Sequence, residues 1–198
     1  IYRVVKDFVN DDGSVVPDAT TPPALAVAMQ KEIPGVTAST RCFANPDWGQ
    51  NFLFTYDNKR FNEQKIFFVD SNFFNLFTFP FLKGNAQHAF KDGNSIVITE
   101  SAAKKYFGNA NPVGQNVLLT GDALNATITG VMKDIPENSQ IKADMIVSMS
   151  SQKDIYKQSL DSEWGDFSLT TYLLLRPGTD PKKLAAKFPA FIELHAGK

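Results

Sequence analysis

Short strand-like and helix-like segments follow one another along this chain in a mixed order. Alternating apolar residues predict strands at residues 52–56 and 143–149. Helical spacing of apolar residues predicts a helix that Thr21 caps and that Pro34 and Gly35 end. Strands and helices do not alternate regularly, as they would in a doubly wound parallel sheet. The order therefore predicts an α+β fold with a mixed sheet.

The kind of predicted secondary structure changes near residue 80, which predicts that the fold has two parts. Residues 80–142 combine short strands with one helix over residues 100–107, and Gly108 stands where a left-handed helix end is expected. The flanking stretches contain a hairpin, further strands, a short helix capped by Ser71 and further helices, the last beginning at Asp180 and interrupted at Pro189. We therefore predict a larger discontinuous part, residues 1–79 and 143–198, with a smaller strand-rich α/β part, residues 80–142, inserted into it.

Composition excludes some classes of partner. The charge is balanced, with 20 Lys and Arg against 21 Asp and Glu, and no basic stripe occurs. Binding to nucleic acid or to anionic lipid therefore lacks its electrostatic basis. The single cysteine, Cys42, is expected to be a packed residue.

The 17 phenylalanines predict a strongly aromatic core. Seven of them gather between residues 67 and 81, and this group could fill the core or line an apolar pocket. Trp48, which precedes a glycine, could be a contact residue or a lid over the core.

Both ends of the sequence have features expected of a fragment. The sequence begins without Met in a strand-like segment and ends shortly after a predicted helix. No run approaches the roughly 18 apolar residues of a membrane helix. We expect the chain to be a piece of a longer protein whose flanks could hold membrane segments.

The motifs of common catalytic and cofactor sites are missing from the sequence. It contains no phosphate-binding loop, no dinucleotide fingerprint and no nucleophile elbow. His88 and His195 have no metal-ligand spacing around them. Asp134, Glu137 and Asp144 gather around a turn, which could bind a cation or be a solvated loop. We therefore expect no enzyme, and no catalytic, cofactor or metal site.

Three segments, in order along the chain, carry a family resemblance; we call them the signature segments. They are residues 95–108 (SIVITESAAKKYFG), 111–115 (NPVGQ) and 129–139 (TGVMKDIPENS). The stretches VDSNFF and FPFLKG, at residues 69–74 and 79–84, agree with the same pattern. Together these segments resemble the MacB-like periplasmic core domain of ABC transporter permeases, related to FtsX and to lipoprotein-releasing permeases. The residues that match the signature, all expected to be structural, are Thr99, Glu100, Phe107, Gly108, Pro112, Gly114, Gly130, Asp134, Pro136 and Ser139.

The resemblance implies a place and a role. Such a domain has a porter-like part with a smaller inserted part, and lies between the first two of four membrane helices, facing the periplasm or the cell exterior. It implies an ABC ATPase, separate or fused, that binds the ATP. It also implies a permease homodimer or related heterodimer held through membrane helices, with a periplasmic adaptor or effector as a further partner. No cofactor is implied in the domain itself.

The function implied is to pass ATP-driven motion of the membrane helices to substrate export or to a periplasmic partner. Two alternatives stay open: a membrane-flanked ligand sensor, and a permease-type regulator of a cell-wall hydrolase or of lipoprotein release. The residues predicted to contact a substrate or partner are Trp48, Phe73, Phe77, Phe81, Asn138 and Gln140.

Overall fold

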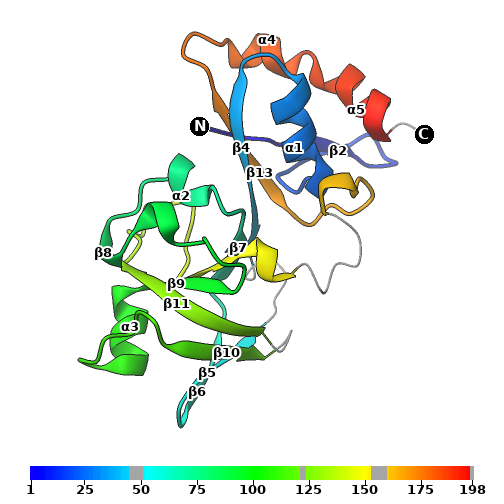
Figure 1. The fold of residues 1–198 in the computed structure, drawn as a ribbon. Helices are drawn as coiled ribbons and strands as arrows, with labels where there is room; N and C mark the ends of the chain where they lie inside the picture. Colours follow the sequence, from blue (N-terminus) through cyan, green and yellow to red (C-terminus); the bar gives the residue numbers. More distant parts are fainter. Residues whose placement is uncertain (45–50, 121–123, 153–159, 197–198) are drawn as a thin grey trace. The chain divides into compact units, whose positions relative to one another are not determined.

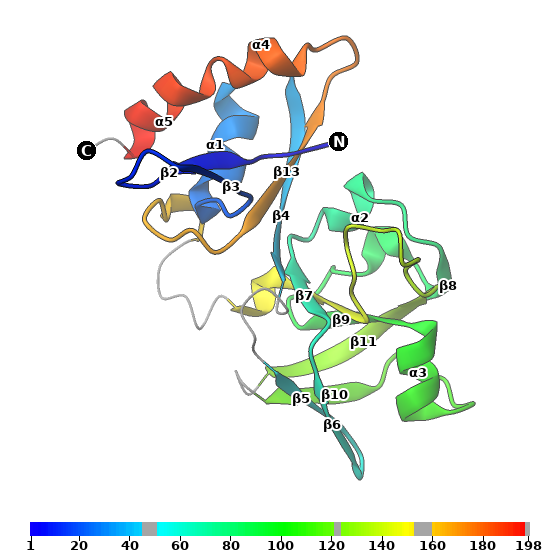
Figure 2. The same ribbon diagram turned by 180° about the vertical axis from the view of Figure 1, so that it is seen from behind.

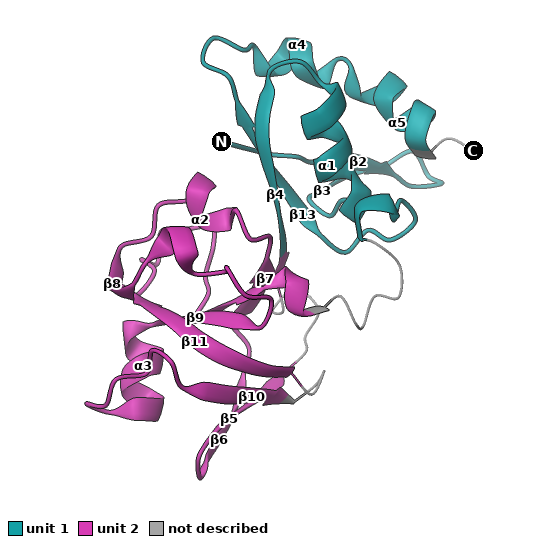
Figure 3. Ribbon diagram, viewed as in Figure 1, with its two compact units in different colours: residues 1–42, 158–198 teal, residues 43–157 magenta. Residues whose placement is uncertain are grey.

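A computed structural model describes residues 1–44, 51–120, 124–152 and 160–196 (Figure 1). The fold is α+β with mixed strand pairing, which confirms the predicted class. The chain divides into two compact units: unit 1 comprises residues 1–42 and 158–198, and unit 2 comprises residues 43–157 (Figure 3).

The inserted unit is larger than the sequence analysis predicted. Strand β7 (Ile66–Val69) runs parallel to β12 (Met145–Ser148), and β12 pairs in turn with β9 (Ser95–Thr99). Strand β5 (Phe52–Tyr56) pairs with β10 (Asn116–Thr120). Strands inside the predicted insertion, residues 80–142, therefore pair with strands outside it. The inserted unit accordingly begins near residue 43 and ends near residue 157. The division into a discontinuous and an inserted part remains.

Unit 1 is a small sheet covered by helices. Strand β13 (Thr170–Leu175) lies between β1 (Tyr2–Arg3) and β4 (Val36–Ala44) and is antiparallel to both. The helices are α1 (Pro23–Glu32), α4 (Pro181–Ala185) and α5 (Phe188–Ala196). Their core contains Val4, Leu25, Met29, Ile33, Val36, Leu173, Leu184 and Phe191. This core joins both ends of the chain, so neither end alone completes unit 1.

A separate hairpin belongs to unit 1. Strands β2 (Lys6–Val9) and β3 (Val15–Asp18) pair only with each other and form a two-stranded sheet (Figures 1 and 2). The turn between them contains Gly13, whose φ of 81° suits a glycine. The sequence pattern predicts one strand over residues 1–9, whereas the structure divides it into β1 and β2 and pairs β2 with β3.

Unit 2 is built around β11 (Leu124–Met132), which is parallel to β9 and antiparallel to β10 and to β8 (Phe81–Gly84). Strand β6 (Lys59–Glu63) extends the sheet beyond β5. Helix α3 (Glu100–Phe107) connects β9 to the turn before β10, and α2 (Phe73–Leu76) is a single turn after β7. Glu63 accepts hydrogen bonds from Lys105 (2.6 Å) and from the Tyr106 hydroxyl, which fixes α3 against β6.

The local predictions have mixed outcomes. Asp180 accepts hydrogen bonds from the Lys182 and Lys183 amides at the start of α4, and the helix is interrupted before Pro189, as predicted. Two other predicted caps are wrong. Thr21 instead donates its hydroxyl proton to Leu169 O (2.8 Å) in a bridge to the segment before β13. The residue before α2 is Asn72, not Ser71.

Two further predictions concern residues 143–160. The alternation at residues 143–149 predicts a strand with one apolar face, yet every residue of β12, which pairs with β7 and β9, is buried, so both faces of the strand are covered. A helix over residues 151–160 falls mostly outside the described residues. Short 3₁₀ turns flank the gap, at Met149–Gln152 and Leu160–Ser162.

Candidate functional site

The loop after β11 closes the start of helix α3. Thr99, the residue directly before the helix, is its N-cap, because its Oγ1 accepts the Ala102 amide proton (3.3 Å). Asp134 adds a second cap from the loop and accepts from the Ser101 amide (3.0 Å) and hydroxyl (2.5 Å). These hydrogen bonds lower the pKa of Asp134. Glu100, exposed in the first turn, is placed favourably for the helix dipole. Two signature segments thus meet at one helix end.

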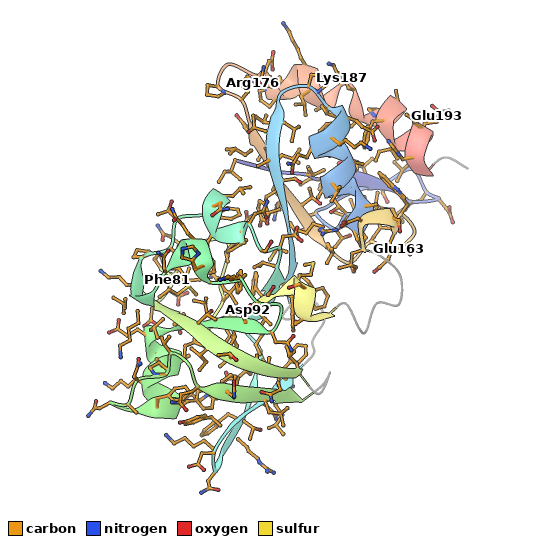
Figure 4. The ribbon with its side chains drawn as sticks, in the orientation of Figure 1. Phe81, Asp92, Glu163, Arg176, Lys187 and Glu193 are labelled. Atoms are coloured by element: carbon orange, nitrogen blue, oxygen red, sulfur yellow. The ribbon has the colours of Figure 1, made fainter. Side chains whose placement is uncertain are left out.

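The signature glycine Gly130 makes room for an aromatic ring. A Cβ atom on Gly130 would lie 2.6 Å from Cε1 of Phe81, on strand β8 (Figure 4). Gly84, which pairs with Gly130, has φ of 79°, and a Cβ there would lie 2.3 Å from Thr129 O. The close approach of β8 to β11 therefore requires glycine in both strands.

The turn between α3 and β10 is docked onto β11. Gly108 ends the helix at the predicted position with a positive φ of 60°, but its ψ of −116° lies outside the predicted left-handed helical region; its amide donates to Lys104 O (3.0 Å). The Gly114 amide donates to Ile128 O (2.8 Å), and Pro112 is buried beneath the turn. The Phe107 ring is buried against Tyr56, with centroids 4.1 Å apart. These residues hold α3 and the turn in place.

A charged pocket of about 170 Å³ opens beside the start of α3. Its polar lining comes from Lys65, Ser101, Asp134, Glu137, Lys142 and Asp144, with Ile135, Pro136 and Ala143 supplying the apolar part. Burial raises the pKa of Asp144, and the nearby Lys65 opposes that rise. The carboxylates that the sequence placed around one turn therefore lie around one pocket. Among the described residues, no three metal-ligating side chains are arranged to hold a cation.

The predicted contact residues on the loop before β12 are exposed. Asn138 and Gln140 face solvent in a turn where the Ser139 amide donates to Pro136 O (2.9 Å) and Ser139 Oγ accepts from the Ile141 amide (3.2 Å). Pro136 and Ser139 thus shape the loop, while Asn138 and Gln140 are free to be contacted. Trp48 lies outside the described residues.

The predicted aromatic contacts gather around α2 and β8. Phe73 is fully buried, and its ring centroid lies 4.9 Å from that of Phe77. Phe81 packs edge-on against Phe74 at 5.1 Å, and both Phe77 and Phe81 are half-buried. The structure therefore places Phe73 in the core and leaves Phe77 and Phe81 partly accessible at its edge.

The feature that sequence reasoning missed is the apolar surface of the β2–β3 hairpin. The sequence pattern predicts a strand through Phe8 and Val9 and no element at Val15 and Val16, which form β3. The only local signal was the turn cluster at residues 10–13, followed by two adjacent valines.

Solved structures place this fold among the extracytoplasmic domains of permeases. A domain of a putative permease protein from Porphyromonas gingivalis matches with a TM-score of 0.75 and 26% identity, covering 92% of this chain and 74% of that one. The periplasmic region of MacB from Actinobacillus actinomycetemcomitans matches with a TM-score of 0.64 and 15% identity, covering 87% and 73%. The extracellular domain of YknZ, a noncanonic ABC-type transporter from Gram-positive bacteria, matches with a TM-score of 0.63 and 13% identity, covering 90% and 84%.

The family itself follows from the sequence match. The profile of the MacB-like periplasmic core domain matches residues 1–191, and the chain belongs to this family. The predicted resemblance is confirmed. None of the curated protein sequences matches the chain. Within the described residues, no helix has the length and apolar content needed to cross a bilayer.

Proposed function

We propose that this domain transmits motion. Nucleotide binding and hydrolysis on a cytoplasmic ATPase would move the membrane helices, and the domain joined to those helices would move with them. Two-state rearrangement of rigid bodies is a common way to carry such a signal. On this proposal the domain has no catalytic or cofactor site of its own, and the ABC ATPase is a partner of the permease.

The observation that supports the proposal is the insertion of one compact unit into another. Both ends of the chain lie in unit 1, and unit 2 is connected to it at residues 42/43 and 157/158. Any displacement of the two ends therefore acts on unit 1 first, and the chain runs from unit 1 into unit 2 at two points. Unit 2 is internally stiff, because its strands are paired throughout and α3 is capped from two segments.

The pocket beside α3 does not have the form of an apolar ligand-sensor site. A sensor of that kind needs a closed apolar pocket with a few converging polar groups. The pocket beside α3 is open and lined mainly by charged groups.

The test measures distances between the two copies of the domain in the parent permease. An exposed position in unit 2, Asn109, is changed to cysteine and spin-labelled, and Cys42, which is buried, is changed to alanine. We expect the distance distribution between the two labels to shift when a non-hydrolysable ATP analogue is added. A permease whose ATPase cannot bind nucleotide is the control. Identical distributions with and without nucleotide would contradict transmission.

A further inference from the structure

The β2–β3 hairpin carries apolar side chains on both of its faces. Phe8 pairs with Val16, and these side chains are 57% and 52% exposed. Val9 pairs with Val15, and these are 66% and 55% exposed. Successive residues of a strand point to opposite faces, so the two pairs occupy opposite sides of the ribbon. Nothing in the described part of unit 1 covers either pair.

The ribbon is nevertheless held firmly at its base. Lys6 donates to Asp18 (2.5 Å) and to Thr20 O (2.8 Å), and its ammonium group lies 4.5 Å from the centre of the Phe167 ring. A two-stranded ribbon is only marginally stable alone in water. Here the base is fixed while the outer half stays uncovered, which is the arrangement expected of an element that another surface covers.

The charges on the hairpin indicate what that surface is. Asp11 and Asp12 are exposed in the turn, Asp7 is exposed near the base of β2, and Lys6 is already paired with Asp18. Placing the acidic turn in a bilayer would bury carboxylates at high cost, and anionic headgroups would repel it. The hairpin therefore fits a protein surface that is apolar with basic residues around it.

The same chain offers a surface on α4 and α5 with exposed lysines and one strongly exposed apolar side chain, Leu194. Lys182, Lys183 and Lys187 are exposed along this segment, and Figure 4 shows Arg176, Lys187 and Glu193 along the same part of unit 1. Leu194 of α5 is 70% exposed, whereas Ile192 is 38% exposed and, two residues earlier, lies on a different side of the helix, with the exposed Glu193 between them. The net charge of the whole chain is −1, so two copies do not repel each other strongly.

We propose that the β2–β3 hairpin of one copy docks on the α4–α5 surface of a second copy, reciprocally. The contact is isologous, as two-fold symmetry requires, because each copy contributes one hairpin and one helical surface. The inference rests on the proposed function, in which two copies work together in one permease. Two short ribbons bury less than a stable dimer interface needs, so the contact is weak unless the copies are tethered. A weak contact suits parts that must separate and close.

Crosslinking between singly labelled chains tests the contact. In a Cys42→Ala background, one chain carries Val16→Cys and the other Leu194→Cys, so a thiol crosslink can form this pair only between copies. Chains are mixed at about 1 mM, the effective concentration that a short tether supplies. The matched control replaces Val16→Cys by Val27→Cys, a valine of α1 that is 40% exposed. We expect about tenfold more crosslinked dimer from the hairpin position than from the control.

Charge exchange then separates docking from chance collision. Asp11→Lys with Asp12→Lys on the hairpin chain should lower the yield, and so should Lys182→Glu with Lys183→Glu on the helical chain. Combining both sets should restore it, and rising salt should weaken the original pair. Phe8→Cys, which lies on the same face of the ribbon as Val16, serves as a second hairpin position if Val16→Cys does not fold. A yield equal to the control, or no restoration in the combined pair, would overturn the proposal.

The outcome is independent of the test of transmission, because crosslinking needs no ATPase. If the hairpin crosslinks form but the distances between the spin labels do not change with nucleotide, transmission is rejected and the contact is supported. Nucleotide-dependent distances without hairpin crosslinks would keep transmission and reject the contact.

Discussion

Single contacts at the residue scale explain why particular residue types occur in the signature segments. Gly130 is a signature residue because the Phe81 ring occupies the space where a side chain would lie. Phe81 in turn belongs to the stretch at residues 79–84 that precedes the signature segments. Residues about fifty positions apart thus depend on each other through one van der Waals contact. Neither residue needs a chemical role to be required at its position.

Replacing Gly130 by alanine is expected to destabilise unit 2 by about 1–3 kcal/mol, because the added methyl group overpacks the contact with Phe81. Urea unfolding followed by circular dichroism measures the change. In Phe81→Ala the space is already open, so adding Gly130→Ala there should cost much less. Gly93→Ala is the control, since a Cβ at Gly93 would meet only ordinary contacts at 3.5 Å. Equal costs in both backgrounds would show that the ring is not the cause.

Helix α3 shows at the element scale how distant segments stabilise one short helix. With eight residues it is too short to be stable alone, so its ends must be satisfied from outside. Thr99 supplies one cap and Asp134 the other, and Gly108 turns the chain at the far end. The pocket beside α3 shares Ser101 and Asp134 with this capping arrangement. A change at Asp134 therefore alters the helix and the pocket together.

Asp134→Ala is expected to lower the free energy of unfolding by about 1 kcal/mol at pH 7, the typical value of a lost helix cap. The folded state lowers the pKa of Asp134 below its ordinary value of 3.8, so this stabilisation is complete above that pH. It is lost as the pH falls through the lower, folded-state pKa. The difference between the two proteins should therefore shrink under acid conditions. Urea unfolding at several pH values measures it.

Glu137→Ala is the matched control for this change, because Glu137 lies in the same loop with its side chain 93% exposed. Its pair with Lys142, at 3.7 Å, is a surface ion pair of small value. A Glu137 effect as large as that of Asp134 would point to general loop charge rather than capping.

The elements that could be predicted from sequence are those whose signal is local. The cap at Thr99, the turn at Gly108 and the start of α4 at Asp180 each depend on residues within a few positions. Thr21 and Ser71 have the right chemistry for caps, but Thr21 uses its hydroxyl group in a bridge to Leu169, 148 positions away. The boundaries of unit 2 and the convergence of Lys65 with Asp144 come from strand pairing, and the burial of β12 on both faces comes from tertiary packing. No short window of sequence contains that information.

The insertion of unit 2 is the main property at the scale of the whole molecule. Its residues are continuous in sequence, from 43 to 157, whereas unit 1 needs both ends of the chain. The aromatic core around Phe73 and Phe74 and the paired strands around β11 lie within that continuous segment.

We expect residues 43–157, expressed alone, to fold into unit 2 and to unfold cooperatively in urea, because the segment contains its own core and its own sheet. The spread of amide signals in a nuclear magnetic resonance spectrum and the shape of the urea transition measure this. Residues 1–42 alone serve as the comparison and should stay unfolded, since β13 is missing. A gradual, non-cooperative transition of the 43–157 segment would contradict autonomous folding.

The position of β13 between β1 and β4 determines the order in which the protein can be completed as it leaves the ribosome. Those two strands contain residues 2–3 and 36–44, and the strand that joins them is made more than 120 residues after the end of β4. Until β13 emerges, both strands have unsatisfied backbone edges, the kind of surface that invites mispairing and that chaperones protect. The segment made in between contains a complete unit and can fold before β13 is available, so folding of this domain can start in its middle and end when its last strand is added.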